Sequence, residues 1–210
     1  MNRPAQQETV VVALGASNLS RGLSRLTAVV RDTIPAPRLL VAAGHGRSYG
    51  ASSRVAWRRL PSILQSGLWR AFDRLEPPAR DRRLLAVVTD IGNDLLYGFS
   101  VEQTAAWVRE CLARLTGRGG RVVVTALPLE SVARAGPLRY RLLKRLYVPG
   151  CPLDLPMLQA AATDLDAAVR HAAAECGAVV IEQPGEWYGF DSIHLRRRRL
   201  DSLWGVASRA

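Results

Sequence analysis

The chain has 210 residues, of which 48% are hydrophobic and 22% charged, and these values are those of an ordinary globular domain. They exclude an intrinsically disordered chain and a collagen-like repeat. Basic residues outnumber acidic ones by 29 to 18, which gives a formal net charge of +11. Because Lys144 is the only lysine and the arginines are scattered, we favour a composition bias over an anionic partner as the origin of this charge.

Short apolar segments rich in β-branched residues alternate with longer stretches of helical character. In chain order we predict strand Val10–Leu14, helix Leu23–Thr33, strand Arg38–Ala43, helix Val55–Leu75, strand Leu84–Thr89, helix Val101–Thr116, strand Arg121–Leu127, helix Leu155–Cys176, strand Ala178–Glu182 and helix Leu195–Ala207. Each strand is apolar on both faces, as in a sheet covered on both sides. The alternation therefore predicts an α/β fold with a parallel sheet between layers of helices.

Two of the segments that connect the predicted helices and strands have a distinctive composition. Residues 76–79 (EPPA) predict a turn before the third strand. Residues 128–154 form the one long connection, and Leu138, Leu142 and Leu146 recur in it at every fourth position. This spacing predicts an amphipathic helix, whose leucines either pack on the core or belong to a lid. We predict a single domain over residues 1–210, with a lid or insertion at 128–154.

The cysteines and the N-terminal segment bear on the compartment. Cys111, Cys151 and Cys176 match neither a zinc spacing nor a disulfide framework, so we expect free thiols. The polar N-terminus lacks the pattern of a signal peptide, and no apolar run approaches the length of about 20 residues that spans a membrane. We therefore expect a cytoplasmic protein without an integral membrane segment.

Polar and glycine-rich segments follow the predicted strands. They are Gly15–Asn18 (GASN), Gly44–Ser48 (GHGRS), Asp90–Asp94 (DIGND) and, before the last helix, Asp191–His194 (DSIH). Ligands of an open parallel sheet bind at the carboxyl ends of its strands, so we expect these segments to converge there. Together they hold a hydroxyl, an imidazole, a carboxylate and an amide, which is the set of groups that acyl transfer needs.

Each of these residues also has an ordinary explanation when it is considered alone. Ser17 would be the nucleophile or simply the N-cap of the first helix. His194 would be the general base or a packing residue, and Asp191, three positions earlier, would orient its ring. Asn93 would donate to an oxyanion or merely stand in a turn. Their coincidence at the predicted strand ends favours the catalytic interpretation.

These segments resemble the conserved blocks of the SGNH hydrolases, also called the GDSL esterase/lipase family, in order and spacing over nearly the whole chain. The serine block corresponds to Gly15–Asn18, the second block to Gly46 (Gly44 is the less favoured choice), the asparagine block to Gly92–Asp94, and the D-x-x-H block to Asp191–His194. The resemblance implies a flavodoxin-like three-layer α/β/α fold with a five-stranded parallel sheet. It also implies a triad of Ser17, His194 and Asp191, and an oxyanion hole formed by Ser17, Gly46 and Asn93, with no cofactor and no metal.

Two positions depart from the family pattern. Ala16 stands where the family usually has an aspartate that braces the serine loop, and Ile91 stands where the asparagine block usually has its first glycine. We expect the first departure to affect the catalytic rate more than the fold. Outside the blocks, His45 either lines the pocket or has no role, His171 is expected to be structural, and Arg196–Arg199 form either a solvated helix turn or a clamp for an anionic substrate.

Other motifs fit less well. Leu19 replaces the second glycine of a G-x-S-x-G nucleophile elbow, and Gly44–Gly50 is one residue too long for a dinucleotide fingerprint. We predict a serine ester hydrolase of the esterase, lipase or thioesterase type that acts on a small-molecule carboxylic ester. The alternatives are an acyltransferase with the same triad, a non-catalytic binding protein on the same fold and, without a recognisable motif, a nucleic-acid binder. The sequence predicts neither the acyl group nor the oligomeric state.

Overall fold

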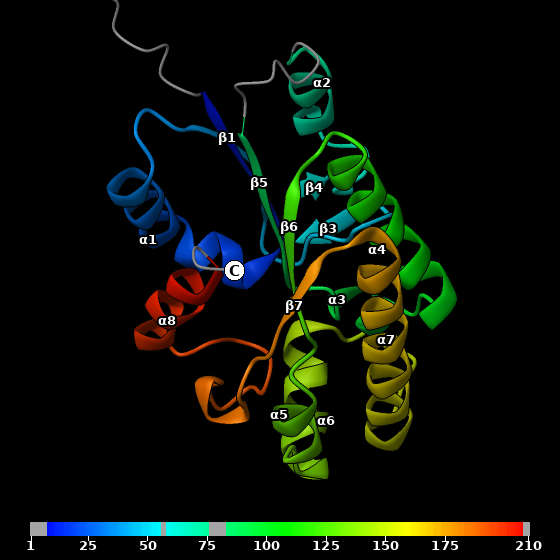
Figure 1. Cartoon of the computed structure of the whole chain (residues 1–210). Coiled ribbons are helices and arrows are strands. Elements are labelled where there is room, and N and C mark those ends of the chain that lie inside the picture. Colours follow the sequence, from blue (N-terminus) through cyan, green and yellow to red (C-terminus); the bar gives the residue numbers. More distant parts are fainter. Residues whose placement is uncertain (1–7, 56–57, 76–82, 208–210) are drawn as a thin grey trace, which may run out of the picture.

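Five parallel strands form the central sheet of the computed structural model, which describes residues 8–55, 58–75 and 83–207 (Figure 1). The strands are β1 (Thr9–Leu14), β2 (Arg38–Ala42), β5 (Arg83–Val88), β6 (Arg121–Thr125) and β7 (Val179–Ile181). They lie in the order β2-β1-β5-β6-β7. This is the order of flavodoxin-like folds, with the second strand at one edge and the later strands added on the other side of the first. The predicted fold class is confirmed.

The central strand β1 is buried along its whole length. Val10, Val12 and Leu14 belong to one hydrophobic cluster, whereas Val11 and Ala13 belong to another. Successive side chains of a strand point to opposite faces of the sheet, so an uninterrupted apolar strand can supply two cores at once. The apolar run of the sequence therefore indicates a strand covered on both sides.

Helices cover both faces of the sheet (Figure 1). The helices α1 (Ser17–Thr33) and α8 (Arg197–Ala207) lie on one face, and α2 (Gly67–Asp73), α4 (Val101–Thr116) and α7 (Leu155–Cys176) belong to the other. On α1, the buried residues Leu19, Leu26 and Val30 follow the helical period and face the sheet.

The predicted bounds of α4 and α7 are confirmed, and both helices have clear termini. Ser100 and Gln103 form a capping box at the start of α4. The side chain of Asp154 accepts a hydrogen bond from the backbone N–H of Met157 at the start of α7. Gly177 ends that helix with a φ of +67°, which glycine adopts without strain.

The helix predicted over Val55–Leu75 is wrong for most of its length. Strands β3 (Ser53–Val55) and β4 (Arg58–Leu60) form a short antiparallel pair instead, and only α2 is helical. Pro61 cannot continue a helix because it lacks the N–H and its ring clashes with the preceding turn. In addition, α1 begins at Ser17 rather than Leu23, and α8 at Arg197 rather than Leu195. The predicted turn at 76–79 lies outside the described residues.

Several further elements lie near the carboxyl ends of the strands (Figure 1). They are α3 (Asn93–Leu96), α5 (Leu129–Ala133), α6 (Pro137–Tyr147) and, after β7, the 3₁₀ turn η1 (Gly185–Trp187). The predicted helix in 128–154 thus corresponds to α6. Its residues Leu138, Leu142 and Leu146 are exposed, so the alternative that they pack on the core is wrong. No helix in the described ranges is long and apolar enough to cross a membrane.

Candidate active site

The candidate site lies at the point where the strand order reverses. The chain continues from β1 to β2 on one side and later adds β5 on the other, which leaves a crevice at their carboxyl ends. A cavity of about 480 Å³ opens there. Its lining includes all the residues singled out from the sequence as the triad and oxyanion donors: Ser17, Gly46, Asn93, Asp191 and His194.

Ser17 is the first residue of α1 and is only 8% exposed. The preceding loop runs very close to the end of β5. A Cβ atom at Gly15 would lie 2.7 Å from Cγ2 of Thr89, so only glycine permits this approach. The side chain of Ser17 makes no cap hydrogen bond to α1, whose N-cap is Ala16, and the N-cap explanation of the serine is therefore wrong.

Asp90, two residues after the end of β5, holds the serine loop in place. Its Oδ2 accepts hydrogen bonds from the N–H groups of Ala16 (2.8 Å) and Leu19 (3.0 Å), and its Oδ1 accepts one from Nδ2 of Asn18 (2.8 Å). The residue has a φ of +61°, a left-handed conformation in which aspartate is enriched among non-glycine residues. Although Ala16 carries no carboxylate, the serine loop is therefore held by the carboxylate of Asp90 from the loop after β5.

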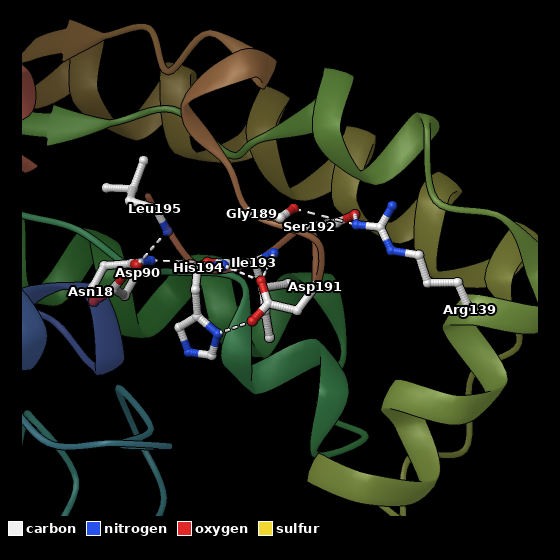
Figure 2. Close-up of polar contacts among 9 residues, drawn as sticks. All are labelled: Asn18, Asp90, Arg139, Gly189, Asp191, Ser192, Ile193, His194 and Leu195. Atoms are coloured by element: carbon white, nitrogen blue, oxygen red, sulfur yellow. Dashed lines mark hydrogen bonds and ion pairs between the residues drawn. The ribbon is translucent and has the colours of Figure 1, made fainter. Parts of the chain in front are cut away.

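Asn18 connects the serine loop to the histidine loop (Figure 2). Its Nδ2 also donates to the carbonyl oxygen of Ile193 (3.0 Å), and its Oδ1 accepts from the N–H of Leu195 (2.8 Å). Ile193 and Leu195, the two neighbours of His194, are therefore both hydrogen-bonded to the side chain of Asn18. This bridge, anchored on Asp90, fixes the position of one loop relative to the other.

His194 and Asp191 form a close pair. Nδ1 of His194 lies 2.5 Å from Oδ2 of Asp191, while Oδ1 of Asp191 accepts the backbone N–H groups of His194 (2.9 Å) and Ile193 (3.3 Å). Burial raises the pKa of Asp191, but the hydrogen bonds from His194 and the charge of its ring outweigh burial and lower it overall. An ionised Asp191 accepts from Nδ1–H, which leaves Nε2 as the free nitrogen of the ring.

Three hydrogen-bond donors at the cavity have no acceptor within the described ranges. They are the backbone N–H groups of Ser17 and Gly46 and the side-chain amide of Asn93. Ser17 lies in the first turn of α1, where helix N–H groups lack an intrahelical acceptor. No hydrogen bond joins Ser17 and His194 in the described structure, and catalytic contacts of this kind often tighten only when substrate binds.

The loop that carries Gly46 is held by α3 and the residue after it. The hydroxyl of Tyr97 donates to the carbonyl oxygen of Gly46 at 2.7 Å, and burial raises the pKa of Tyr97 to about 12, so this hydroxyl keeps its proton. Oδ2 of Asp94 accepts from the N–H of Tyr49 at 3.0 Å. Gly46 has a φ of +65°, which favours glycine. Gly44 does not line the cavity.

Much of the remaining cavity wall is apolar and comes from the region between β6 and the middle of α7. It includes Leu143, Leu146, Tyr147 and Leu158. The ring centroid of Tyr147 lies 6.3 Å from that of His194 in an edge-to-face arrangement. An apolar wall beside a hydroxyl–imidazole–carboxylate group suits a substrate with an apolar portion.

Other sequence candidates lie elsewhere. His171 is exposed and lies 3.3 Å from Glu175, and none of Arg196–Arg199 lines the cavity, whereas His45 does. No group of three or more His, Cys, Asp or Glu side chains suited to a metal ion occurs in the described ranges. Cys111, Cys151 and Cys176 are free thiols, as predicted. Asp90 and Asn18 belong to the segments Asp90–Asp94 and Gly15–Asn18, but no local signal in the sequence indicates a role for either.

No protein-family model matches the sequence, and no curated protein is significantly similar to it. Solved structures are similar over nearly the whole chain. A carbohydrate acetylesterase family member from Sinorhizobium meliloti has a TM-score of 0.59 at 13% identity, with 94% of both chains covered. A member of the lipolytic protein G-D-S-L family from Veillonella parvula has a TM-score of 0.57 at 13% identity, with 94% of this chain and 96% of that chain covered. The psychrotrophic esterase EstA from Pseudoalteromonas has a TM-score of 0.52 at 12% identity, with 95% and 94% covered. The chain therefore has the fold of the SGNH (GDSL) hydrolases and esterases.

Proposed function

We propose that this protein is a serine hydrolase of carboxylic esters with Ser17 as its nucleophile. The observation that carries the proposal is the meeting of Ser17, the His194–Asp191 pair and three uncommitted N–H donors at one cavity. A nucleophile, an oriented base and oxyanion donors are the parts that acyl transfer requires. A binding protein that had lost catalysis would have no need of the short contact between His194 and Asp191.

In the proposed first step, Oγ of Ser17 attacks the carbonyl carbon of the ester. Nε2 of His194 takes the hydroxyl proton and then passes it to the leaving alcohol. Asp191 holds the ring through Nδ1–H and stabilises the imidazolium. In the second step, water loses a proton to Nε2 and attacks the acyl-enzyme, which releases the acid and restores the Ser17 hydroxyl.

The tetrahedral intermediates carry a negatively charged oxygen, which the donors of Ser17, Gly46 and Asn93 would stabilise. Such donors act without reorganising because the surrounding structure already holds them in place. Here Tyr97 fixes the Gly46 carbonyl, and Asp90 and Asn18 fix the two loops that carry the nucleophile and the base. We assign Asp90 and Asn18 as positioning residues.

Labelling by a fluorophosphonate probe tests the nucleophile without knowledge of the substrate. The similar esterase EstA is described as inhibited by monoethylphosphonate, which makes a phosphorus electrophile a suitable choice. We expect the wild type to be labelled and Ser17→Ala not to be. Ser24→Ala removes an exposed hydroxyl from the same helix and should be labelled like the wild type.

Hydrolysis of short p-nitrophenyl esters gives the corresponding rate. Ser17→Ala should lower kcat by a factor on the order of 10⁶, with an unchanged circular dichroism spectrum. Labelling or hydrolysis that persists in Ser17→Ala would disprove the assignment of the nucleophile. A folded wild type that is neither labelled nor active would instead favour a non-catalytic binding protein.

A further inference from the structure

The outer face of α6 carries an apolar stripe that nothing covers in the described ranges. Leu138, Leu142 and Leu146 are 77%, 62% and 67% exposed. Their spacing of four residues places them along one side of the helix. Single exposed leucines are common on protein surfaces, but a continuous stripe on one helix marks an interaction surface.

Phe190 is a further exposed apolar residue, and it contacts α6. It is 72% exposed, and the guanidinium of Arg139 from α6 lies 4.4 Å from its ring centroid. Arg139 also donates to Oγ of Ser192 at 2.8 Å, so α6 and the histidine loop are tied together (Figure 2). Arg139 therefore connects the helix that carries the stripe to Phe190, beside the candidate active site.

Positive charge flanks the stripe on its other side. Arg141 and Arg145 immediately precede Leu142 and Leu146, are exposed, and have no ion-pair partner within the described ranges. The segment 131–153 contains no Asp or Glu. The other two basic side chains of α6 already have hydrogen-bond partners. Arg139 donates to Oγ of Ser192, and Lys144 donates to the carbonyl oxygen of Leu153. Arg141 and Arg145 are thus left for an external anion.

The opposite side of the same helix faces the cavity. Tyr140, Leu143 and Tyr147 line it, and Leu146 reaches both the cavity and the outer surface. In Figure 1, α6 lies near the carboxyl ends of the strands. One helix therefore separates the cavity that contains Ser17 from an outer surface of leucines and arginines.

We propose that the outer face of α6, made of Leu138, Leu142, Leu146, Arg141 and Arg145, docks onto an anionic lipid surface, from which an ester with an apolar acyl chain enters the cavity. Leucines beside arginines match the boundary between acyl chains and phosphate headgroups. The access of an ester to Ser17 rests on the proposed function, whereas the docking does not.

A second copy of the chain is a less suitable occupant of this face. Two α6 faces brought together would place the arginines of both copies at one interface, in a protein whose formal net charge is already +11. A soluble polyanion would use the arginines but would leave the leucines exposed to water. An anionic lipid surface satisfies both kinds of side chain.

Vesicle sedimentation with the Ser17→Ala chain tests docking independently of catalysis. We expect binding to phosphatidylcholine vesicles that contain phosphatidylglycerol, much weaker binding to phosphatidylcholine alone, and weakening by salt. Leu138→Gln/Leu142→Gln and Arg141→Gln/Arg145→Gln should each reduce the affinity by about tenfold or more, with unchanged melting temperatures. Arg21→Gln/Arg31→Gln removes two exposed arginines of α1 and should bind like the parent chain.

The proposal would be overturned if Leu138→Gln/Leu142→Gln bound the vesicles as tightly as the parent chain. It would also be overturned if the control Arg21→Gln/Arg31→Gln lost as much vesicle affinity as Arg141→Gln/Arg145→Gln. A parent dimer that the leucine variant converts to a monomer would overturn it as well, because the face would then belong to a second copy. With Ser17 restored, Leu138→Gln/Leu142→Gln should hydrolyse a vesicle-embedded ester more slowly and a soluble short ester at the wild-type rate. An equal loss on both esters would also count against docking, and failure of fluorophosphonate labelling would count only against the proposed function.

Discussion

Asp90 combines an unusual backbone conformation with an unusually demanding set of hydrogen bonds. Its φ of +61° costs on the order of 1 kcal/mol or more for a residue with a Cβ, and such strain persists only where the surroundings impose it. Here the carboxylate accepts from Ala16, Leu19 and Asn18 at the start of α1. The backbone strain at the end of β5 is thus coupled to the position of Ser17.

Asp90→Asn isolates the contribution of the carboxylate. Asparagine tolerates the left-handed conformation, but its NH₂ group cannot accept the N–H bonds that one carboxylate oxygen now receives. We expect a stability loss of about 1–3 kcal/mol and, well below the melting temperature, a clear fall in kcat with little change in KM. Urea unfolding and steady-state kinetics on a p-nitrophenyl ester measure the two. A purely structural role for Asp90 would leave kcat unchanged once the protein is folded.

Substitution of Asn93 tests whether its side-chain amide donates to the oxyanion. Asn93→Ala should lower kcat by roughly 10²–10³, because one such donor contributes about 2.7–4 kcal/mol in the transition state. KM should change little, since the bond forms mainly with the developing oxyanion. Steady-state kinetics that show a change confined to KM would assign Asn93 to substrate binding instead.

The sequence predicted residues that line the cavity, but not the residues that hold them in place. Ser17, Asn93 and His194 could be found because each follows a recognisable strand or precedes a helix, and strand ends of a parallel sheet converge. Asp90 lies 74 positions from Ala16, and its role depends on a left-handed turn that no local pattern specifies. Similarly, the hydrogen bond from the N–H of Leu195 to Oδ1 of Asn18 spans 177 positions and depends on the packed fold.

Local signals also explain why the helix α7 was predicted correctly and the structure of segment 53–75 was not. The bounds of α7 follow from Asp154 at its start and Gly177 at its end, two local signals. Strands β3 and β4 have only three residues each, which is too short for a periodic pattern to distinguish them from a helix. In the sequence, Pro61 is the local signal that a helix does not continue through this region.

The helix α6 forms part of the cavity wall, so its inner residues should influence which acyl chains fit. Leu143 lines the cavity and is half-buried. Leu143→Trp adds volume there and should shift the preference among p-nitrophenyl esters toward shorter acyl chains. The profile of kcat/KM against chain length, measured on monomeric substrates, gives the readout.

A matched control lies one position earlier on the same helix. Leu142 is 62% exposed and does not line the cavity, so Leu142→Trp should leave both the profile and the melting temperature nearly unchanged. If the two variants shift the profile equally, α6 does not form the acyl-binding wall.

A fully buried carboxyl group, that of Asp94, lies next to Asn93 in the chain. Asp94 is fully buried at the start of α3, and its Oδ1 has no hydrogen-bond partner within the described ranges. Burial raises the pKa of Asp94 to about 6, although hydrogen bonds from Ser48 and from the N–H of Tyr49 oppose the increase. Folding therefore opposes the charge on this carboxyl at neutral pH.

The consequence for global stability has a definite sign. Because the folded chain retains the Asp94 proton up to about pH 6 while the unfolded chain loses it near the ordinary value of 3.8, this group makes folding less favourable as pH rises between those values. Asp94→Asn removes the titration but keeps an oxygen that can accept from Tyr49. The free energy of unfolding of the variant minus that of the wild type should therefore increase by about 1–2 kcal/mol between pH 5 and pH 7.5. Urea unfolding of both proteins at the two pH values measures this difference, in which the remaining titrating groups largely cancel. A difference that is constant, or that decreases toward pH 7.5, would show that Asp94 keeps an ordinary carboxylate pKa despite its burial.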